Sequence, residues 1–498
     1  MKKIIILIIL FLGYYITLSA QEEFHYFNKV YQSDTNLMLS VTATPIDDDF
    51  MIGGFFNWID GYSAFYIRKI DYLGNELWNT IIDGDVNFRT VQSGNAMNTT
   101  FDGNIIFIGG IGTSDLDEDF ILIKVSPTGD VLFKKRYETT SKEGSSQVIV
   151  CEEGGYLLVG FSQLVEPNIT PAQTYLIRTD EQGDTLWTRK HHENVLPLYA
   201  EQTSDGGFLI SGYQLNTDTG YDMYVLKTNS HGMIEWKRNY GTDEHDGGCY
   251  ATEHTNGDYI ILGMINSNTI VETNLYFARL NSENGDILQE KRHQKYDRYS
   301  TGATPYVDKN GNILITTSSH GPIPFWEAAF AVFDIDGNML IDEPISSGFG
   351  GADYIRDLEF TIDGGYVLTG FNYLSPQKSW VIKVDSLGKS CGTAPCDSTV
   401  LLDTSIGDFS FGIEKENFYV SPNPAVQECV LHYKLPLENP HAVVEIYNQH
   451  GNRVKRQLLS SAFREQQLDI SDFSSGIYVY QIVVPSRVLF SGKLVVQK

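Results

Sequence analysis

The feature that most constrains this chain is a segment of about fifty residues that recurs along most of its length. Each copy reads as an acidic residue or Asn, then Gly, then a small or polar residue, then an apolar strand. The copies start at Asp102, Glu153, Asp205, Asn256, Asn310 and Asp363, with a more diverged one at Asp47–Asp49. The first strand residues, from Phe50 to Tyr366, are spaced by 55, 51, 52, 51, 54 and 53 residues. Such a period indicates one supersecondary unit that is stacked on copies of itself.

Each unit also has the same internal order. An apolar strand such as 156–160 leads through a variable loop to a second strand such as 175–179. A turn of the form Asp-x-x-Gly follows, as at Asp180–Gly183, and then a strand that usually carries an aromatic residue, as at Trp187. Gly and Asx residues stand where tight turns need them. With the strand that precedes the Asp-Gly turn, each unit has four antiparallel strands, which is typical of a propeller blade. We therefore predict an all-β chain with a seven-bladed β-propeller over residues 22–390; eight blades or an open array is the alternative.

The way the ring closes is also readable. The seventh unit ends at Gly388 without its outermost strand. Residues 27–31, near the start of the chain, match that missing strand in pattern, as a comparison with 133–137 shows. We expect the N-terminal strand to complete blade seven, because an unpaired edge strand invites aggregation.

The first residues predict export. Met1, Lys2 and Lys3 precede an apolar run from Ile4 to about Leu18, and small residues follow at Ser19 and Ala20. This order is typical of a signal peptide, here 1–20, which the general secretion machinery at the inner membrane would recognise. A membrane anchor is the alternative, but the run is shorter than the roughly 20 residues that a spanning helix needs. We expect no transmembrane segment in the mature chain.

The charge balance excludes one class of partner. Lys and Arg number 36 against 63 Asp and Glu, which gives a formal net charge of −27. Binding to phosphate backbones needs clustered cations, and none occur here. We therefore expect no nucleic-acid partner.

The C-terminal part differs in composition. After a linker rich in Ser, Thr and Asp at 391–413, residues 414–498 contain four short motifs in order. Their positions are Pro422, Asn423 and Pro424; Tyr447 and Gly451; Gly476 and Tyr478; and Lys493 at the start of a Lys-Leu-Val-Val end. This region resembles the type A C-terminal sorting domain of type IX secretion substrates. The resemblance implies a small immunoglobulin-like β-sandwich, recognition by the type IX machinery at the outer membrane, and a protein that is secreted or attached to the outer cell surface. An ordinary immunoglobulin-like accessory domain is the alternative.

Candidate ligand-binding residues lie in the variable loops. The Asp-Gly and Asp-x-x-Gly turns are short and nearly uniform, so they are expected on one face of the ring, and the variable connections on the other. Binding residues on rigid scaffolds concentrate in such loops. Aromatic side chains there could stack on a sugar or anchor a protein; the alternative is that they pack over the blades. The candidates are Trp58, Tyr62, Phe325, Trp326 and Tyr373.

No motif points to catalysis, a cofactor or a metal. The chain lacks a Gly-x-Ser-x-Gly elbow, a His-Glu-x-x-His pair and a phosphate loop. The acidic run Asp115–Asp119 is better explained by the repeat than by a calcium loop, and His245 and His254 lack an evident third zinc ligand. Our leading hypothesis is a non-enzymatic binding module for a glycan or a protein. The alternative is a secreted carbohydrate-active enzyme, similar to a glycoside hydrolase or a lyase, with acidic residues in the inter-blade loops. Arg89, Arg298 and Arg356 are also expected in inter-blade loops, where a cluster of arginines could bind a carboxylate.

Overall fold

The computed structural model describes residues 26–498 outside a set of short gaps. The gaps are 33–36, 58–62, 83–86, 90–94, 115–116, 164–170, 192–193, 217–219, 266–273, 294–298, 302–304, 321–325, 349–351, 374–376, 391–395, 403–417, 434, 436–440, 449–452, 461–463 and 485–486. Within the described residues, no helix has the length and apolarity that crossing a membrane requires.

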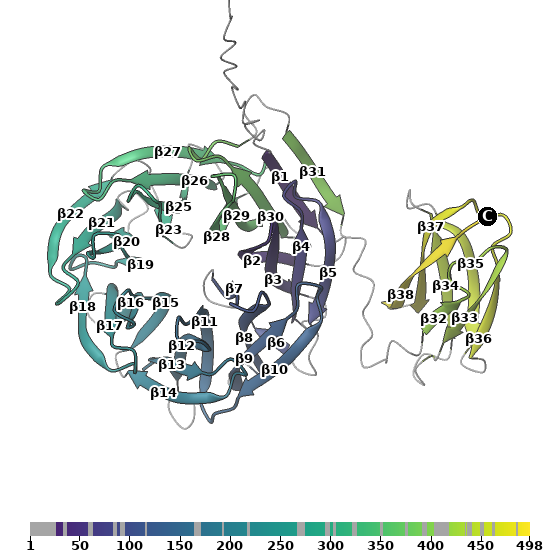
Figure 1. The fold of residues 1–498 in the computed structure, drawn as a ribbon, viewed down its shortest axis with the longest axis horizontal. Helices are drawn as coiled ribbons and strands as arrows, with labels where there is room; N and C mark the ends of the chain where they lie inside the picture. Colours follow the sequence, from purple (N-terminus) through teal and green to yellow (C-terminus); the bar gives the residue numbers. More distant parts are fainter. Residues whose placement is uncertain are drawn as a thin grey trace, which may run out of the picture.

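Seven antiparallel sheets in the described part of the chain form the blades of a closed ring (Figure 1). The innermost strands are β2 (Leu37–Ile46), β6 (Asn87–Arg89) with β7 (Met97–Thr99), β11 (Lys142–Val150), β15 (Val195–Gln202), β19 (Gly247–Glu253), β23 (Tyr299–Thr301) with β24 (Tyr306–Val307), and β28 (Asp353–Phe360). The second strands are β3 (Asp49–Asn57), β8 (Ile105–Ser114), β12 (Tyr156–Gln163), β16 (Phe208–Asn216), β20 (Tyr259–Ile265), β25 (Ile313–His320) and β29 (Tyr366–Asn372). The fold is the seven-bladed propeller that the repeat predicts.

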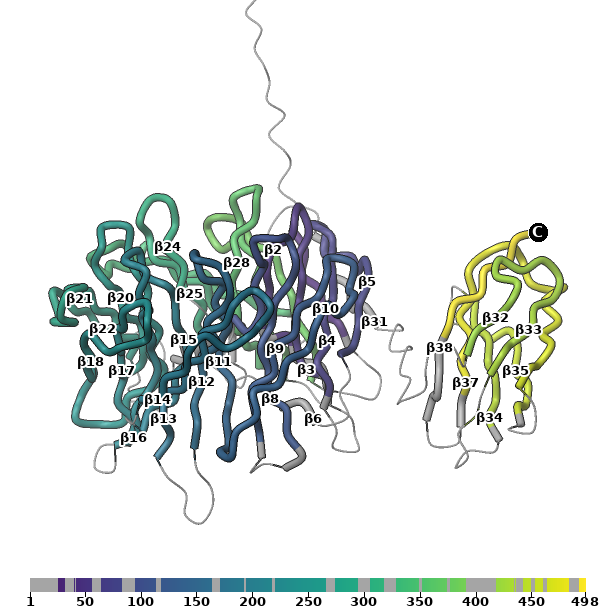
Figure 2. Tube along the Cα trace, turned by 60° about the horizontal axis from the view of Figure 1, so that its bottom comes forward, coloured from purple at the N-terminus to yellow at the C-terminus, as the bar shows by residue number. Residues whose placement is uncertain are grey.

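The two outer layers follow the same order. The third strands are β4 (Ser63–Ile70), β9 (Asp117–Val125), β13 (Gln173–Thr179), β17 (Gly220–Thr228), β21 (Asn274–Leu280), β26 (Trp326–Phe333) and β30 (Lys378–Val384). The outer strands are β5 (Glu76–Ile82), β10 (Val131–Tyr137), β14 (Thr185–His191), β18 (Ile234–Tyr240), β22 (Ile287–His293), β27 (Met339–Ile345) and, in blade seven, β1 (Tyr26–Gln32). The turn after each inner strand and the turn before each outer strand lie at one face of the ring, which we call the short-turn face; the other connections form the variable face (Figure 2).

The N-terminal strand closes the ring, as the sequence predicts. β1 pairs antiparallel with β30, with Phe27 opposite Lys383 and Tyr31 opposite Ser379. The segment after blade seven differs from expectation. Within 391–413, predicted to be a linker, β31 (Cys396–Leu402) pairs parallel with β1 as a fifth strand. The amides and carbonyls on the free edge of β1 account for this pairing, because an edge strand offers hydrogen bonds to any extended segment of the chain.

Adjacent blades are joined at the Asp-x-x-Gly turns. In the turn that ends at Gly74, the glycine has a φ of 78°, and a Cβ there would lie 2.8 Å from the Phe27 ring. At Gly232 the equivalent Cβ would lie 2.7 Å from the Trp187 ring of the preceding blade. The aromatic residues of the outer strands thus pack on glycines of the next blade, which explains why the repeat keeps both residue types.

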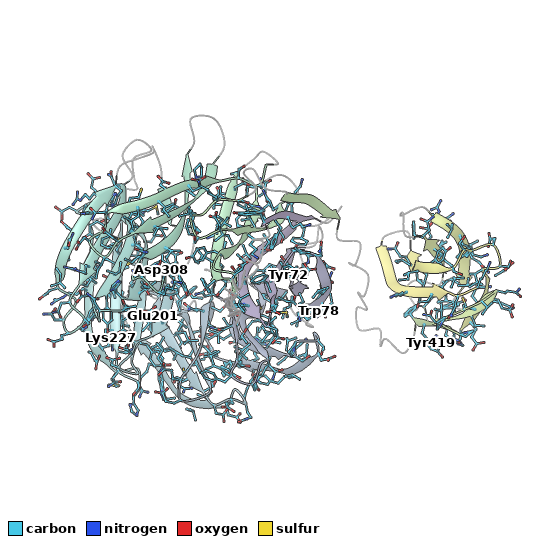
Figure 3. The ribbon with its side chains drawn as sticks, turned by 45° about the horizontal axis from the view of Figure 1, so that its top comes forward. Tyr72, Trp78, Glu201, Lys227, Asp308 and Tyr419 are labelled. Carbon is cyan, nitrogen blue, oxygen red and sulfur yellow. The ribbon has the colours of Figure 1, made fainter. Side chains whose placement is uncertain are left out.

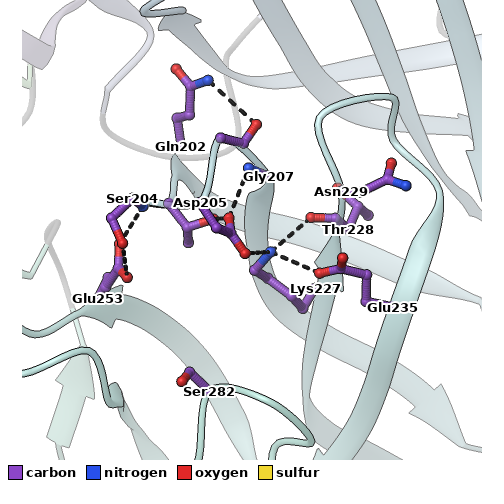
Figure 4. A network of polar contacts seen from close by, with 12 residues as sticks. Gln202, Ser204, Asp205, Gly207, Lys227, Thr228, Asn229, Glu235, Glu253 and Ser282 are labelled. Atoms are coloured by element: carbon purple, nitrogen blue, oxygen red, sulfur yellow. Dashed lines mark hydrogen bonds and ion pairs between the residues drawn. The ribbon is translucent and has the colours of Figure 1, made fainter.

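Ion pairs with buried lysines explain the acidic residues of the Asp-Gly turns. The Lys227 ammonium, on a side chain that is 1% exposed, contacts Asp205 at 2.8 Å and Glu235 at 2.9 Å (Figure 4). It also donates to the carbonyl of Thr228 at 2.9 Å. The same pairing recurs between Lys124 and Asp102 at 2.7 Å and between Lys383 and Asp363 at 2.5 Å. These turn carboxylates are therefore structural.

Two further sheets form the C-terminal domain. One has the order β32 (Phe418–Ser421), β33 (Glu428–Tyr433) and β36 (Glu465–Asp469). The other has the order β35 (Arg453–Ser460), β34 (His441–Tyr447), β37 (Gly476–Val484) and β38 (Arg487–Val496). Their shared core includes Leu431, Ile446 and Leu494, all fully buried. This arrangement is the immunoglobulin-like sandwich that the sequence predicts.

Candidate functional site

The predicted ligand-binding aromatics are only partly placed. Trp58, Tyr62 and Phe325 lie outside the described residues, and Trp326 is the first residue of β26. Tyr373, just after β29, is 60% exposed on the variable face. These five residues stay a prediction.

Tyr373 stands on a small aromatic cluster. Its ring meets Tyr354 edge-on at 6.4 Å between centroids, and Tyr354 stacks on the nearly buried Phe371 at 5.1 Å. The Arg356 guanidinium lies 5.6 Å from the Phe371 centroid. The backbone amide of Tyr373 donates to the carbonyl of Ala352 at 2.7 Å. The sequence alone does not indicate that Tyr354 contacts Tyr373 or that Arg356 lies over Phe371, because these contacts join two different strands.

The expected positions of the arginines need correction. Arg356 lies within β28 and Arg89 within β6, so both belong to inner strands and not to inter-blade loops. Arg298 lies outside the described residues. The repeat pattern marks strand ends only at the short turns, so it does not show where the inner strands β6 and β28 begin after the connection from the preceding blade.

The inner strands share a β-bulge. A side chain at the bulge of one blade accepts a hydrogen bond from a backbone amide on the inner strand of the next blade. Register shifts occur between Ser145 and Gln147 and between Ile355 and Asp357. The amide of Ala200 donates to Oε1 of Gln147 at 2.7 Å, and that of Ala43 donates to Oδ2 of Asp357 at 2.9 Å. Unpaired strand edges around the channel are thus satisfied by side chains.

Carboxylates beside the channel take part in this capping. Both oxygens of Asp357 accept hydrogen bonds, Oδ1 from the Leu358 amide at 2.9 Å and Oδ2 from Ala43 and from Thr42 Oγ1 at 3.1 Å. Burial nevertheless raises the pKa of the Asp357 carboxyl to about 7. Glu359, two residues on, has a pKa raised well above its usual value by burial and by Asp357.

Glu201 is the corresponding acid across the ring, on the inner part of the molecule (Figure 3). Its Oε2 accepts from Thr252 Oγ1 at 2.9 Å and from the Tyr199 hydroxyl at 3.2 Å, and its Oε1 accepts from the Glu253 amide. Burial raises the pKa of the Glu201 carboxyl to about 7. Raised pKa values can mark catalytic acids, but the oxygens of Glu201 and Asp357 are already engaged in joining strands.

A fourth acid with a raised pKa, Glu143, is fully buried between blades two and three. Oε1 of Glu143 accepts from Thr139 Oγ1 at 2.6 Å and from Ser162 Oγ at 2.9 Å. Its Oε2 has no hydrogen-bond partner among the described residues, and burial raises the pKa of this carboxyl to about 7. An orphan oxygen of this kind is the expected place for a proton.

The other polar residues considered for chemistry have structural partners. Asp119 accepts from Arg136 Nε at 2.7 Å and from the Thr139 amide at 2.9 Å. The two ring nitrogens of His254 contact the carbonyl of Gly311 at 2.8 Å and Oδ1 of Asn256 at 2.9 Å. Among the described residues, no three His, Cys, Asp or Glu side chains are grouped so that they could hold a metal ion.

In the C-terminal domain, two of the four sequence motifs meet in space. The Asn423 amide donates to the carbonyl of Lys493 at 2.7 Å, and Oδ1 of Asn423 accepts from the Val495 amide at 2.8 Å. Ala425 then exchanges backbone hydrogen bonds with Val495 at 2.8 Å and Gln497 at 2.9 Å. The segment of Pro422, Asn423 and Pro424 is thereby fixed to the last strand, about seventy residues further along the chain.

The other two motifs support the same sheet. The Tyr447 hydroxyl donates to Glu445 at 2.5 Å, which also contacts Arg453 at 2.7 Å. Tyr478 is buried, stacks on Phe473 at 4.7 Å, and donates to the carbonyl of Ser474 at 3.0 Å. Gly476 is opposite Val496 at the end of β38, whereas Gly451 lies outside the described residues.

Comparison with known families decides what this domain is. Residues 419–497 match the family described as secretion system C-terminal sorting domain. This region is a type IX secretion sorting domain. The sorting domain marks the protein for export by type IX secretion to the cell surface or the extracellular space, and it implies interaction with the type IX machinery. A search of the curated proteins finds no match to the chain.

Several solved structures are similar to the chain at low identity. The propeller domain of the Trilobed protease from Pyrococcus furiosus is 10% identical, with a TM-score of 0.41, covering 73% of this chain and 100% of that one. The polysaccharide lyase Uly1 is 10% identical, with a TM-score of 0.45, covering 73% and 99%. The Penicillium chrysogenum α-L-arabinanase, complexed with arabinobiose, is 13% identical, with a TM-score of 0.40, covering 73% and 98%.

Proposed function

We propose that the propeller is a non-enzymatic binding module for a glycan or a protein outside the cell. A signal peptide at 1–20 and the general secretion machinery would bring the chain across the inner membrane, and the sorting domain would complete its export. The observation that carries the binding proposal is Tyr373, a 60% exposed aromatic residue whose ring contacts Tyr354, which in turn stacks on Phe371. A preorganised aromatic surface can stack on a sugar ring or anchor a protein without an entropy cost of ordering.

Arrays of glycans and of extracellular proteins, probed with the mature chain 21–498, test this proposal. Tyr373→Ala should weaken binding to the ligand found by at least tenfold. Tyr419→Ala is the matched control, because Tyr419 is 47% exposed but lies in the sorting domain (Figure 3), and it should leave the affinity within twofold. A ligand whose binding ignores both substitutions would remove Tyr373 from the site.

A secreted carbohydrate-active enzyme is the second candidate, and Glu359 is the observation in its favour. The pKa of its carboxyl is raised by burial and by Asp357, as a general acid requires. A screen for glycan hydrolysis or lyase cleavage by the mature chain decides between the two. Cleavage that Glu359→Gln abolishes would replace the binding proposal; cleavage that persists in this variant would exclude Glu359.

A further inference from the structure

A pocket with a volume of about 450 Å³ opens on the short-turn face, between blades seven and one. This is the face opposite Tyr373, so the pocket lies beyond the site of the proposed function. Three kinds of side chain line it: exposed acids, apolar or aromatic walls, and a buried lysine. The residues that carry the argument are Asp47, Asp48, Tyr72, Phe360, Ile362 and Lys383.

The pocket has a cause in the sequence, namely the diverged first repeat. In blade one, Pro45 pairs with Phe50, so residues 46–49 form the connection. In blade seven, Phe360 pairs with Tyr366, so five residues, 361–365, form it. Residues 46–49 also contain an extra pair, Ile46 with Asp49, which leaves Asp47 and Asp48 as a two-residue turn. The blade-one turn is therefore shorter and narrower than its equivalents.

At other junctions these turns touch across the blades. The Ser204 amide and hydroxyl donate to the Glu253 carboxylate at 2.6 and 2.7 Å. His254 contacts the carbonyl of Gly311 at 2.8 Å. The short turn of blade one leaves this space beside blade seven open instead, which is why a pocket forms at this junction.

The walls of the pocket are apolar or aromatic, and the Phe360 wall is held in place. Phe360 is 41% exposed, Ile362 is 84% exposed and Tyr72 is 45% exposed. The Phe360 ring is stacked on Tyr306 at 6.2 Å between centroids, with an angle of 2° between the planes. Its orientation is thus fixed before any ligand arrives, which reduces the entropy cost of binding.

The charges of the pocket are unbalanced at its rim. The inner carboxylates are neutralised, Asp363 by Lys383 at 2.5 Å and Asp49 by Lys69 at 3.0 Å. Asp47 and Asp48 are exposed, and within the described residues neither forms an ion pair or hydrogen bond. The free rim therefore carries two negative charges next to an apolar wall.

We propose that this pocket binds an extracellular protein segment that presents an Arg or Lys side chain beside an apolar residue. The aliphatic stem and the apolar neighbour would pack on Phe360 and Ile362, and the cation would meet the carboxylates of Asp47 and Asp48. A second copy of this chain suits the pocket poorly, since its net charge is −27. The residues before β1 suit it poorly as well, since they include Glu22 and Glu23.

The test compares two small probes that differ in charge. N-acetyl-Arg-Phe-amide and its uncharged citrulline equivalent are titrated into the mature chain 21–498, with ligand-observed NMR to detect millimolar binding. The arginine probe should bind at least tenfold more tightly than the citrulline probe. Equal binding of the two probes, or no binding of the arginine probe at 10 mM, would overturn the proposal.

Variants then locate the site. The double variant Asp47→Asn with Asp48→Asn should lose at least tenfold in affinity for the arginine probe. It should still fold, because Asn tolerates the φ of 52° at position 47. The matched control, Glu152→Gln with Glu181→Gln, removes two exposed charges from the same face at blade three and should change the affinity less than twofold. If both double variants weaken binding equally, the effect is one of net charge and the pocket is excluded.

Phe360→Ala should lower the affinity for both probes, and Tyr373→Ala should lower the affinity for neither. Failure of this proposal is therefore distinguishable from failure of the proposal for the variable face.

Discussion

The Tyr31 hydroxyl donates a hydrogen bond to the carbonyl oxygen of Gly74 at 2.8 Å, and this bond joins β1 to blade one. Tyr137 makes the same bond to Gly183 at 2.8 Å, and Tyr240 makes it to Gly285 at 2.6 Å. The junction at which the ring closes thus uses the same contact as junctions between blades that are continuous in sequence. The contact by which β1 closes the ring is therefore the same as a contact between consecutive blades, although β1 is far in sequence from the other strands of blade seven.

Tyr31→Phe should lower the free energy of unfolding by about 1–3 kcal/mol, because it leaves the buried Gly74 carbonyl without its donor. The ring itself stays, together with its contact to the Arg68 guanidinium at 4.1 Å, so only the hydroxyl is tested. Urea unfolding of the mature chain measures the change. Tyr137→Phe is the matched control and should cost a similar amount; a much smaller cost for Tyr31→Phe would mean that the hydrogen bond to Gly74 contributes little to closing the ring.

The stability of the propeller should fall as the pH rises from about 4.5 to about 7. Burial raises the pKa of Glu143 from its usual 4.5 to about 7, so in this range the folded state holds a proton that the unfolded state has lost. The stabilisation is fully present below 4.5 and is lost as the pH passes 7. Thermal unfolding at pH 5 and pH 8 measures the difference. Glu143→Gln should reduce the difference and the exposed Glu152→Gln should not; an unchanged difference in Glu143→Gln would mean that Glu143 is ionised throughout.

Much of the fold could be predicted because the same strand and turn pattern occurs in every blade. Seven copies of one pattern fix the blade, and the likeness of 27–31 to 133–137 identifies the closing strand, whose Tyr31 corresponds to Tyr137. β31 could not be predicted in the same way. It lies outside the repeat, and its position depends on a free strand edge that exists only after the ring has closed.

The sites were less predictable, because they depend on neighbours from different blades. The shorter turn at Asp47–Asp48 was visible as a divergence, but its consequence, a pocket against Phe360, needs the ring. The raised pKa of Asp357 likewise arises from its burial in the assembled ring, and it is opposed by hydrogen bonds from Thr42 and Ala43, which are more than three hundred residues away in sequence.

In the ion-pair cluster of Lys227, Asp205 and Glu235, removing the two carboxylates should lower the free energy of unfolding more than removing the lysine. Asp205→Asn with Glu235→Gln leaves a 1% exposed ammonium without a counter-charge, and should cost about 3–5 kcal/mol of unfolding free energy. Lys227→Met should cost less, because the side chains of Asp205 and Glu235 are 55% and 45% exposed and stay solvated when the cation is gone. Urea unfolding of the native chain and of the two variants measures their relative stabilities. The reverse order would show that the ammonium reaches water in the folded state.

Truncations on either side of β31 should show how much β31 contributes to the stability of the propeller. A chain that ends at 413 keeps β31, whereas a chain that ends at 390 exposes the outer edge of β1. The shorter chain should be less stable by about 2 kcal/mol or more, since each lost backbone hydrogen bond contributes about 0.5–1.5 kcal/mol. Both chains lack the sorting domain, so the comparison isolates the seven paired residues from Tyr26 with Cys396 to Gln32 with Leu402. Equal unfolding midpoints would show that this pairing adds nothing to the ring.

Asn423→Ala should impair export without harming the propeller. Asn423 makes both side-chain hydrogen bonds that fix the segment at 422–424 to β38, at 2.7 and 2.8 Å, so its loss should destabilise the sorting domain by about 1–3 kcal/mol. We expect the variant to accumulate in the periplasm in part, and a chain without 418–498 to accumulate there entirely with its propeller folded. Cell fractionation measures both, and limited proteolysis of the periplasmic material reports whether the propeller is folded.

Asn98→Ala, at an exposed position on β7, is the control that should be exported normally. Normal export of the truncated chain would contradict the dependence of export on the sorting domain, and normal export of Asn423→Ala alone would show that the machinery tolerates a loosened turn.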